Sequence, residues 1–585
     1  MRTEEFNVFS VKPEDTFNMG LNAFNRAGSW FGIFVRPSRF ASGATVGDWG
    51  CSDIFINTRR GSVIKLKSNL LLQLIPVHHG EIIPFAVSAT PTELIVRTAY
   101  GTIKCTFAET SLIMIKGENG LGLRLECDTE MHDFVRKRGE KGWECGFRYV
   151  CGMVFNPVKG SMKMDSRWDY ERLLTTDMRG EVMPDGNGEF LLAVEEFTQT
   201  GAVRAEYPTY EEALADVTAD WESFLEKQPL LSGEFEGMRE KAAYITWSHL
   251  VSPSGHIKRP YLYMYPAMAA SSWQMCENAV CLKNNLPLAV ELLLNMIDRQ
   301  SDKGQLPDFY DDVRVWDRCF KPPIQGWALD ILMREHDLKK EVPKDKLVYM
   351  YEGFGKWAEW FMKYRDDDED GIPQYEHGDE TGNDDSPLFK YSSKVELPEL
   401  CAFIALLYEK LGDLAVIVDR PEESEAWYEK SRVLIDKMIK TFWNGERFVG
   451  RTFGDHRVID GTSLHFYRPL VLGKRLPPEI LEKMTADLAE EGGYLTPYGY
   501  MAERLTSIDY SRSAFGRGAI TSSDNILIIT ALYYAGKTDL AREVAGRFCR
   551  GIMGIDTPFW PAQIGFPGTW GACAFQIMAN IYCNM

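Results

Sequence analysis

Residues 399–413 read ELCAFIALLYEKLGD, and the spacing of their apolar side chains decides the fold of the second half of the chain. Leu400, Phe403, Ile404 and Leu407 recur every three or four residues and therefore form one apolar face of a helix. The same spacing recurs from about residue 233 almost to the end of the chain. It predicts that this whole half is helical.

Start and stop signals divide the helical half into segments. Gly412 is the expected end of the helix just described. Other helices are expected to begin at Pro287, Pro343, Pro421, Pro477 with Pro478, and Thr538. About twelve segments of ~30 residues fit between residues 234 and 582, and ~30 residues is the length of a helix plus its connection. Such helices, joined as consecutive hairpins, predict a closed toroid of inner and outer helices.

Alternate helices differ in character. The segments near SSWQMCEN, KPPIQGWAL, KVELPEL, GTSLHFYRP, GRGAITSSDN and GTWGACAF open with polar and aromatic residues. The helices between them, such as 421–439, are ordinary charged amphipathic helices. This alternation predicts an inner ring whose N-terminal ends meet at one mouth, where free N–H groups and aromatic walls hold a polar ligand.

The first part of the chain has a shorter period. Residues 91–128 contain β-branched and aromatic runs broken at Tyr-Gly, Glu-Thr and Glu-Asn-Gly, which is typical of antiparallel strands. We therefore expect a β-sandwich over residues 1–207, a connecting helix within 208–232, and the helical domain over 233–585. The connecting helix is indicated by Leu214, Val217, Trp221 and Leu225.

Length and composition restrict the class of protein. The chain has 585 residues, of which 45% are hydrophobic and 25% charged, as in folded multidomain proteins. A net charge of −19 argues against binding to nucleic acid or to anionic lipid. No segment has the ~20 apolar residues of a membrane span, and the N-terminus lacks a signal-peptide pattern. The cysteines show no zinc spacing. A cytoplasmic protein, monomeric or homodimeric, is expected.

Residues 375–389, YEHGDETGNDDSPLF, crowd carboxylates among glycines. Cleavage of a glycosidic bond requires one carboxylic acid to protonate the departing oxygen and a second carboxylate to activate water or attack the sugar. An acid that keeps its proton near neutral pH needs desolvation or neighbouring negative charge. Asp384 lies next to Asp385 and four residues from Glu380, so its surroundings suit that role. A solvated or metal-binding loop is the alternative.

The order GQLPDF, KPPIQGWA, DGIPQYEHGDETGNDDSP and FGRGAI resembles glycoside hydrolase family 63 and its relatives, including the trehalases. The resemblance covers mainly residues 230–585. It implies a β-sandwich followed by an (α/α)6 barrel, and inverting hydrolysis of α-glucosidic bonds by an exo-acting enzyme. Relatives carry a Glu-Ser-Gly-x-Asp core whose Asp is the general acid. Glu380, Gly382 and Asp384 match that core, and Thr381 replaces its Ser.

The second carboxylate departs from the family pattern. Relatives place the general base in a Glu-Asn-Tyr-like segment before the last inner helix, but residues 550–575 contain no glutamate there, and Asp556 is the only carboxylate. Either Asp556 is the base, or Glu503 in YGYMAERLTSIDYS takes that role, or the protein is not an ordinary inverting hydrolase. We favour Asp556.

The resemblance also implies a set of sugar-binding residues: Trp273, Gln274, Gln325, Trp327, Glu380, Arg517 and Trp570. Many relatives have Trp-Asp where this chain has Trp273-Gln274, so the pocket is expected to differ from that of a strict glucosidase. A flat indole at Trp327 suits stacking on a sugar face. Trp273 packed in a core, and Arg517 in a structural salt bridge, are the alternatives.

A calcium loop is predicted just upstream, in RDDDEDGIPQYE. Asp366, Asp368, Asp370 and Gly371 follow the order in which a tight turn aims alternate carboxylates at one hard cation. The loop does not complete an EF-hand, since position twelve is His377. A structural Ca²⁺ ion or a solvated acidic connection both fit this pattern.

Taken together, the sequence predicts a glycosidase acting on a small carbohydrate, without an organic cofactor. A polysaccharide lyase or an α-rhamnosidase on the same architecture is the enzymatic alternative. A carbohydrate-binding protein without catalytic activity is the non-enzymatic one, since the Glu-Asn-Tyr segment is missing.

Overall fold

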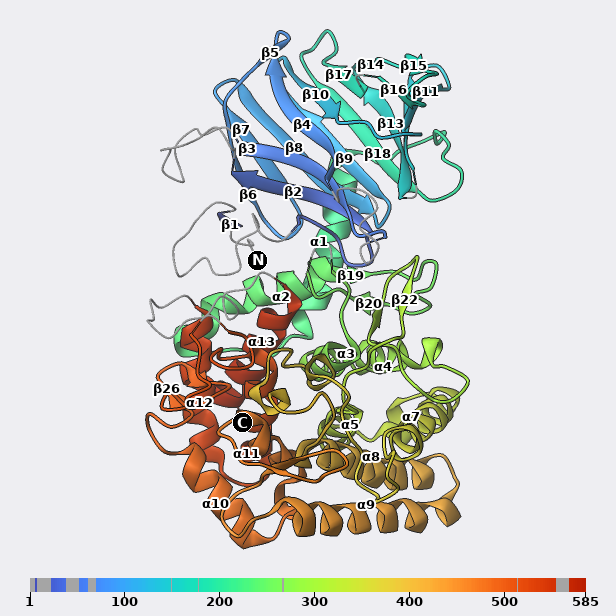
Figure 1. The fold of residues 1–585 in the computed structure, drawn as a ribbon. Coiled ribbons are helices and arrows are strands. Elements are labelled where there is room, and N and C mark those ends of the chain that lie inside the picture. The colour runs from blue at the N-terminus through green and yellow to red at the C-terminus, as the bar shows by residue number, and fades with distance from the viewer. Residues whose placement is uncertain are drawn as a thin grey trace.

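The computed structural model describes residues 6–7, 23–37, 52–61, 70–148, 150–176, 178–265, 268–512, 514–553 and 568–584. It has an N-terminal region of antiparallel sheets and a C-terminal helical domain (Figure 1). The prediction of a multidomain chain with this order of β and α parts is confirmed.

Two antiparallel sheets form the N-terminal region. The first has the order β1 (Phe6–Asn7), β6 (Phe85–Ala89), β7 (Leu94–Thr98), β8 (Gly101–Glu109), β9 (Leu112–Gly117), β18 (Phe190–Phe197), β13 (Cys151–Lys159), β12 (Gly142–Phe147) and β11 (Phe134–Arg138). The second has the order β14 (Ser161–Met164), β17 (Met178–Met183), β10 (Leu121–Cys127), β4 (Leu70–His78), β3 (Ser52–Thr58) and β2 (Phe31–Pro37), with β5 (Glu81–Ile82) paired to β4. Their apolar faces contribute to one shared core.

The turns between these strands lie where the sequence predicts them. β7, β8, β9 and β10 follow one another with breaks at Tyr100, at Glu109 and at Asn119 with Gly120. Asn119 and Gly120 have φ values of 57° and 78°. Asn and Gly adopt positive φ at low cost, and this tight turn carries the chain from β9 in the first sheet to β10 in the second.

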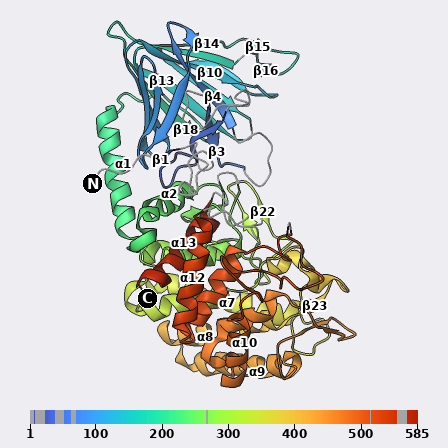
Figure 2. The ribbon, with the colours of Figure 1, turned by 90° about the vertical axis from the view of Figure 1, so that its left-hand side faces the viewer.

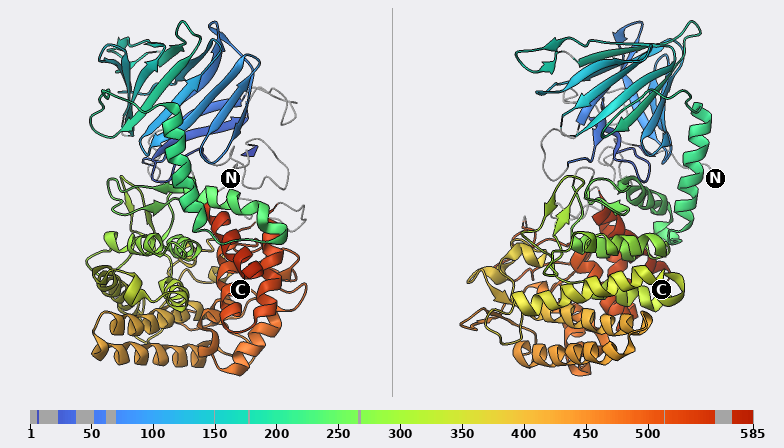
Figure 3. Two further views of the ribbon diagram at one scale, coloured as in Figure 1. Left: turned by 180° about the vertical axis from the view of Figure 1, so that it is seen from behind. Right: turned by 90° about the vertical axis from the view of Figure 1, so that its right-hand side faces the viewer.

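Helix α1 (Tyr210–Glu226) connects the two parts of the chain. Thr209 caps it, because its side chain accepts from the Glu212 N–H while the Glu212 carboxylate accepts from the Thr209 N–H. Its buried face packs on the first sheet: Tyr210 and Ala213 join Leu112 in a small separate core. The helix runs along the outside from the sheets down to the helical domain (Figure 2 and Figure 3). The predicted connecting helix is therefore present.

The helical domain contains α2 (Arg239–His249), α3 (Ser272–Cys281), α4 (Leu286–Leu294), α5 (Gln325–Glu335), α6 (Leu338–Glu341), α7 (Lys344–Tyr364), α8 (Pro398–Ile417), α9 (Pro421–Phe442), the 3₁₀ segment η6 (Leu464–Arg475), α10 (Pro478–Leu488), α11 (Ser522–Tyr534), α12 (Thr538–Ile552) and α13 (Thr569–Asn584). Short strand pairs lie in its connections: β19 (Leu250–Val251) with β20 (Tyr261–Leu262), β21 (Phe309–Tyr310) with β22 (Val315–Trp316), β23 (Val395–Glu396) with β24 (Gly450–Thr452) and β25 (Val458–Ile459), and β26 (Leu495–Thr496) with β27 (Gly499–Tyr500).

Alternate segments of this domain contact one another in a closed cycle. α3 contacts α5, α5 contacts α8, α8 contacts η6, η6 contacts α11, α11 contacts α13, and α13 returns to α3. These are the segments that open with polar and aromatic residues in the sequence. The charged amphipathic helices pack outside them: α4 on α3, α7 and α9 on α8, α10 on η6, α12 on α11 and α13, and α2 on α13.

The predicted helix ends are right in several places and wrong in one. Pro421 and Pro478 open α9 and α10, and Thr538 opens α12. Gly412, however, does not end its helix, because α8 continues to Ile417. A Cβ atom at Gly412 would lie 2.7 Å from the ring of Tyr428 in α9. The glycine therefore permits a close approach of two helices rather than a stop.

Among the described residues, no helix combines the length and the apolar character needed to cross a membrane.

Candidate active site

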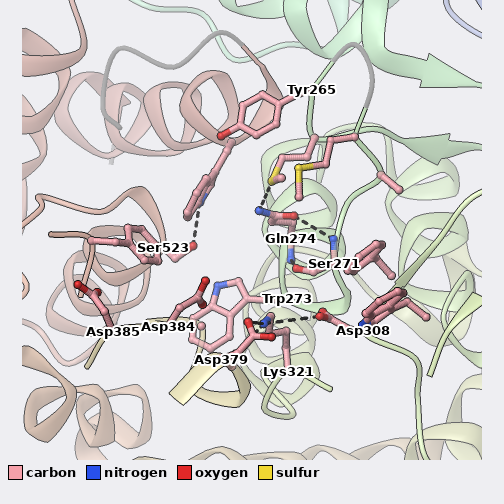
Figure 4. A pocket seen from close by; sticks show the side chains of 18 of the residues that line it. Tyr265, Ser271, Trp273, Gln274, Asp308, Lys321, Asp379, Asp384, Asp385 and Ser523 are labelled. Carbon is pink, nitrogen blue, oxygen red and sulfur yellow. Dashed lines mark hydrogen bonds and ion pairs between the residues drawn. The ribbon is translucent and has the colours of Figure 1, made fainter. Parts of the chain in front are cut away.

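One cavity of about 690 Å³ lies at the N-terminal side of the ring segments (Figure 4). It is lined by Met264, Tyr265, Met268, Ala269, Ser271, Trp273, Gln274, Asp308, Phe309, Trp316, Lys321, Asp379, Gly382, Asp384, Asp385, Arg468, Phe515, Ser523 and Trp570. Most of these residues stand in the first turn of a ring helix or in the connection that precedes one. The mixture of aromatic walls and a few polar groups is typical of a small-molecule site.

The first turn of α3 supplies one wall. Ser271 caps the helix: its hydroxyl accepts from the Gln274 N–H at 3.3 Å, and the Gln274 side-chain oxygen accepts from the Ser271 N–H at 2.9 Å. This reciprocal cap fixes Trp273 between the two polar residues. The Arg468 guanidinium stands over the Trp273 ring, 5.3 Å from its centroid, which further limits its movement.

The acidic loop supplies the part of the wall next to the Trp273 ring. A short 3₁₀ turn, η4 (Gly378–Thr381), ends at Gly382, whose φ of 79° suits glycine. The sharp reversal after this turn brings both Asp379 and Asp384 to the cavity (Figure 4). Asn383 is buried behind them and donates to His465 Nε2 at 2.9 Å. The glycines of the loop therefore position two carboxylates side by side.

Asp379 and Asp384 are close enough for one proton to lie between them when the pair carries a single negative charge. The two side chains are hydrogen-bonded to each other. Solvent reaches Asp384 through the cavity, but protein atoms crowd its other sides; this desolvation and the charge of Asp379 raise the pKa of Asp384 to about 6. Desolvation opposes ionisation of Asp379 too, but Lys321 outweighs it and lowers the pKa of Asp379. The shared proton is therefore held by Asp384.

Lys321 determines which of the two aspartates is ionised. Its ammonium lies 2.7 Å from Asp379 Oδ1 and 3.6 Å from a carboxylate oxygen of Asp308, and it also donates to the Asp379 carbonyl at 2.6 Å. Asp308 is 3% exposed, and burial raises its pKa to about 6 despite the nearby ammonium. Lys321 thus sits between two carboxylates, with Asp379 the nearer, and its charge favours an ionised Asp379.

Arg468 closes the floor of the cavity with a buried ion-pair network. Its guanidinium is almost wholly buried and donates to Asp524 Oδ1 at 2.8 Å, to Glu399 Oε1 at 3.1 Å and to the Thr381 carbonyl at 2.9 Å. Desolvation opposes the charges of Arg468 and Asp524, but their mutual attraction prevails, raising the pKa of the arginine and lowering that of the aspartate. This network ties α8, η6 and α11 to the acidic loop.

Glu277 links two tryptophans of the cavity wall. Trp273 Nε1 donates to Glu277 Oε1 at 2.7 Å, and Ser523 is hydrogen-bonded to the same carboxyl. Trp570 Nε1 in turn donates to Ser523 Oγ at 2.8 Å. Glu277 is 1% exposed, and this desolvation raises its pKa to about 7. One buried carboxyl therefore holds side chains from α3, α11 and α13 together.

Replacing Glu277 with glutamine is expected to flatten the pH dependence of stability. The folded-state pKa of about 7 exceeds the ordinary value of 4.5, so the stabilisation from this group is present below about pH 4.5 and is lost as the pH rises through about 7. The wild type should therefore lose up to about 3 kcal/mol over this range that the variant does not lose. Urea unfolding at about pH 5 and pH 8 measures it, with the exposed Glu359→Gln as control. If the free energy of unfolding falls equally between the two pH values in the wild type and in Glu277→Gln, the raised pKa does not belong to Glu277.

The structure brings some predicted site residues together and places others elsewhere. Trp273, Gln274, Asp384 and Trp570 line the cavity. Gln325 and Trp327 do not line it: both are buried in α5, where Trp327 Nε1 donates to Thr530 at 3.0 Å. Glu380 is buried under the loop and accepts from Arg365 at 3.0 Å and from the Glu376 N–H at 2.8 Å. Its contacts are those of a residue that shapes the loop.

Arg517 stands beside the cavity. Its Nε lies 3.3 Å from Asp385 Oδ2, and the adjacent Gly516 N–H also donates to Asp385. The 515–520 run thus anchors Asp385, which lines the cavity.

Only one of the two candidate bases, Glu503, lies among the described residues. Glu503 is fully buried, accepts from the Thr462 hydroxyl, and is not among the cavity-lining residues. Asp556 lies outside the described residues. The choice between them stays a prediction.

The predicted calcium loop brings its three carboxylates within 4.8 Å of one another. Other side chains already contact two of them: Arg451 pairs with Asp370, and His456 Nε2 lies 2.9 Å from Asp368. Calcium binding at Asp366, Asp368 and Asp370 therefore stays a prediction.

Several residues of the cavity are missing from the sequence-based set, namely Asp308, Lys321, Asp379, Asp385, Arg468 and Ser523. Asp308 and Lys321 belong to the runs GQLPDF and KPPIQGWA, so their place in those runs is a usable signal. Arg468 lies in η6, within the GTSLHFYRP segment that predicts part of the cavity mouth, but the sequence does not show which of its residues faces the cavity.

Residues 270–558 match the family model of the mannosylglycerate hydrolase MGH1-like glycoside hydrolase domain. The matched range spans most of the helical half of the chain. The expectation of a glycosidase that resembles glycoside hydrolase family 63 is thereby confirmed. The cavity and the Asp379–Asp384 pair both lie within the matched range. No curated protein shows significant sequence similarity to the chain.

Solved structures similar to this chain include glycoside hydrolases. A family GH92 inverting mannosidase from Bacteroides thetaiotaomicron has a TM-score of 0.55 at 11% identity, covering 98% of this chain and 86% of that one. A second GH92 glycosyl hydrolase has a TM-score of 0.53 at 12% identity, covering 91% and 79%. The GH63 mannosylglycerate hydrolase from Thermus thermophilus, in complex with glucose, has a TM-score of 0.48 at 17% identity, covering 58% and 99%. The two GH92 similarities extend over both the β region and the helical domain, and they show a shared fold.

Proposed function

We propose that the protein is an exo-acting, inverting glycoside hydrolase that removes a glucose-type or related mannose-type sugar from an α-linked oligosaccharide or small glycoside. The observation that carries the proposal is Asp384, an acid with a raised pKa that faces the cavity and shares its proton with Asp379. A group with this pKa is protonated in a large fraction of molecules near pH 6 and is able to protonate a leaving oxygen.

Each cavity residue has a part in the proposed reaction. The indole rings of Trp273 and Trp570 offer flat apolar faces to a sugar ring. Gln274 and Asp385 offer hydrogen-bond partners to its hydroxyls. Asp384 donates its proton to the glycosidic oxygen as the C–O bond breaks. Lys321 stabilises the ionised Asp379, and the negative charge of Asp379 favours the protonated form of Asp384.

Inversion requires a second carboxylate on the other face of the sugar, about 6.5–9.5 Å from the acid, with water between them. We favour Asp556 for this role. Its segment rejoins the described chain at Gly568 and Thr569, whose backbone lies against Met264 at the cavity wall, where the Thr569 N–H donates to the Met264 carbonyl at 2.9 Å. Glu503 is the second choice, since it is buried away from the lining residues.

The finer architecture proposed with this function is a β-sandwich followed by an (α/α)6 barrel. The closed cycle of contacts through α3, α5, α8, η6, α11 and α13 supports it. The proposed partner is a small carbohydrate, as in relatives whose structures contain glucose or D-glycerate. A cytoplasmic setting and a monomeric or homodimeric state accompany the proposal as predictions.

The stereochemistry of the released sugar tests the proposal. Incubation with a panel of α- and β-linked disaccharides and of small α-glycosides, followed by proton NMR, should show the β-anomer appearing first from an α-linked substrate. First appearance of the α-anomer would contradict inversion. Binding of sugars without turnover of any panel member would favour the carbohydrate-binding alternative.

A further inference from the structure

The charged groups that line the cavity are mostly acidic. Asp308, Asp379, Asp384 and Asp385 face it, together with Lys321 and Arg468. Both cations are already paired with carboxylates. Lys321 lies between Asp379 and Asp308, and Arg468 is 1% exposed and held by Asp524 and Glu399.

Two further arginines contact lining residues without lining the cavity themselves. Arg517 is paired with Asp385 at 3.3 Å, and the Arg314 guanidinium stands 5.2 Å from the ring centroid of Trp316. Among the described lining residues there is thus no cation that is not already paired with a carboxylate.

Asp308 contributes a second, independent observation. It is 3% exposed, lines the cavity, and its Oδ1 atom has no hydrogen-bond partner. A buried carboxylate oxygen without a partner is costly, and a hydroxyl or ammonium hydrogen of a ligand would relieve that cost. A second carboxylate brought beside it would instead add like-charge repulsion in a desolvated place.

We propose that the site takes glycosides whose leaving group is neutral or positively charged, and that it discriminates against leaving groups that carry a carboxylate. The proposal rests on the proposed glycosidase function and narrows its substrate class. Discrimination of this kind arises as much from repulsion of the wrong ligand as from contacts with the right one. It separates this chain from an enzyme that acts on glycosides of glycerate.

The test uses pairs of α-glycosides that differ only in charge. Glucosylglycerol and glucosylglycerate, and the matching mannosyl pair, exchange a hydroxymethyl group for a carboxylate. An aminoethyl and a hydroxyethyl glycoside form the cationic pair. We expect kcat/KM to be at least about tenfold higher for the glycerol than for the glycerate glycoside at low salt. The ratio of kcat/KM for the glycerol glycoside to that for the glycerate glycoside should shrink as salt screens the repulsion. Added salt should lower kcat/KM for the aminoethyl glycoside more than for the hydroxyethyl glycoside.

Asp385→Asn should narrow the glycerol-to-glycerate ratio, because it removes one negative charge from the lining. Asp419→Asn is the matched control: Asp419 is exposed, pairs with Lys339 and Lys344 away from the cavity, and should leave the ratio unchanged. A glycerate glycoside cleaved as fast as its glycerol partner would overturn the proposal while leaving the glycosidase function intact.

A binding measurement keeps the inference testable if no glycoside is cleaved. Isothermal titration of the wild type with each member of the glycerol and glycerate pair compares their affinities directly. Tighter binding of the glycerate member overturns the inference. Weaker binding of that member supports it, even where the absence of turnover counts against the proposed hydrolysis.

Discussion

Replacing Asp384 with asparagine is expected to lower kcat/KM for an alkyl α-glycoside by at least about 10²-fold, because asparagine cannot protonate the leaving oxygen. The loss should be much smaller for a glycoside with an acidic phenol as leaving group, since such a group departs without a proton. Steady-state kinetics on the two substrates measure this difference.

Asp419→Asn, an exposed substitution of the same type, serves as the control and should leave both rates unchanged. An Asp384→Asn enzyme that loses the same factor on both substrates would place the residue in substrate binding or in folding rather than in proton donation. A retained rate on both would remove Asp384 from the mechanism.

Replacing Lys321 with methionine is expected to affect both activity and stability. The ammonium is the counter-charge for two carboxylates, and its removal leaves them partly buried without compensation. Asp308 is buried but the Asp379 side chain is about half exposed, so the cost is expected to be about 1–3 kcal/mol, less than for a fully buried pair. Asp379 then competes for the shared proton, so the rate near pH 6 should fall by about tenfold or more.

Lys321→Met should also shift the alkaline limb of the pH profile of kcat/KM to higher pH. Lys321 lowers the pKa of Asp384, so its removal lets the Asp379–Asp384 pair retain its proton to higher pH. Lys430→Met, which removes an exposed lysine paired with Glu359, is the matched control. Loss of stability with an unmoved alkaline limb would show that Lys321 supports the fold but does not tune the acid.

Helical spacing and turn chemistry predicted the architecture well because they are local signals. The strands of residues 94–127 and the helices opening at Pro421 and Pro478 follow from residues near one another in the chain. Gly412 shows the limit of this reasoning. Glycine both ends helices and admits close neighbours, and only the position of Tyr428 in α9 decides between these roles.

Residues of the candidate site were predictable from the sequence only where they belong to a short recognisable motif. Asp384 and Trp273 are recognisable from their flanking residues, and both line the cavity. Lys321, which is far from Asp379 in sequence, acquires its role from the packing of α5 against the acidic loop region. Gln325 and Trp327 lie in a matching run but point into the core, because consecutive residues of a helix face different directions.

The pH profile of kcat/KM for wild type and Asp384→Asn, on one α-glycoside, tests the central claim most directly. The wild-type rate should fall as the pH rises above about 6, where Asp384 loses its proton, and the variant should lack this alkaline limb. The same limb in both proteins would contradict the account, because the group that must be protonated for catalysis would then be another one.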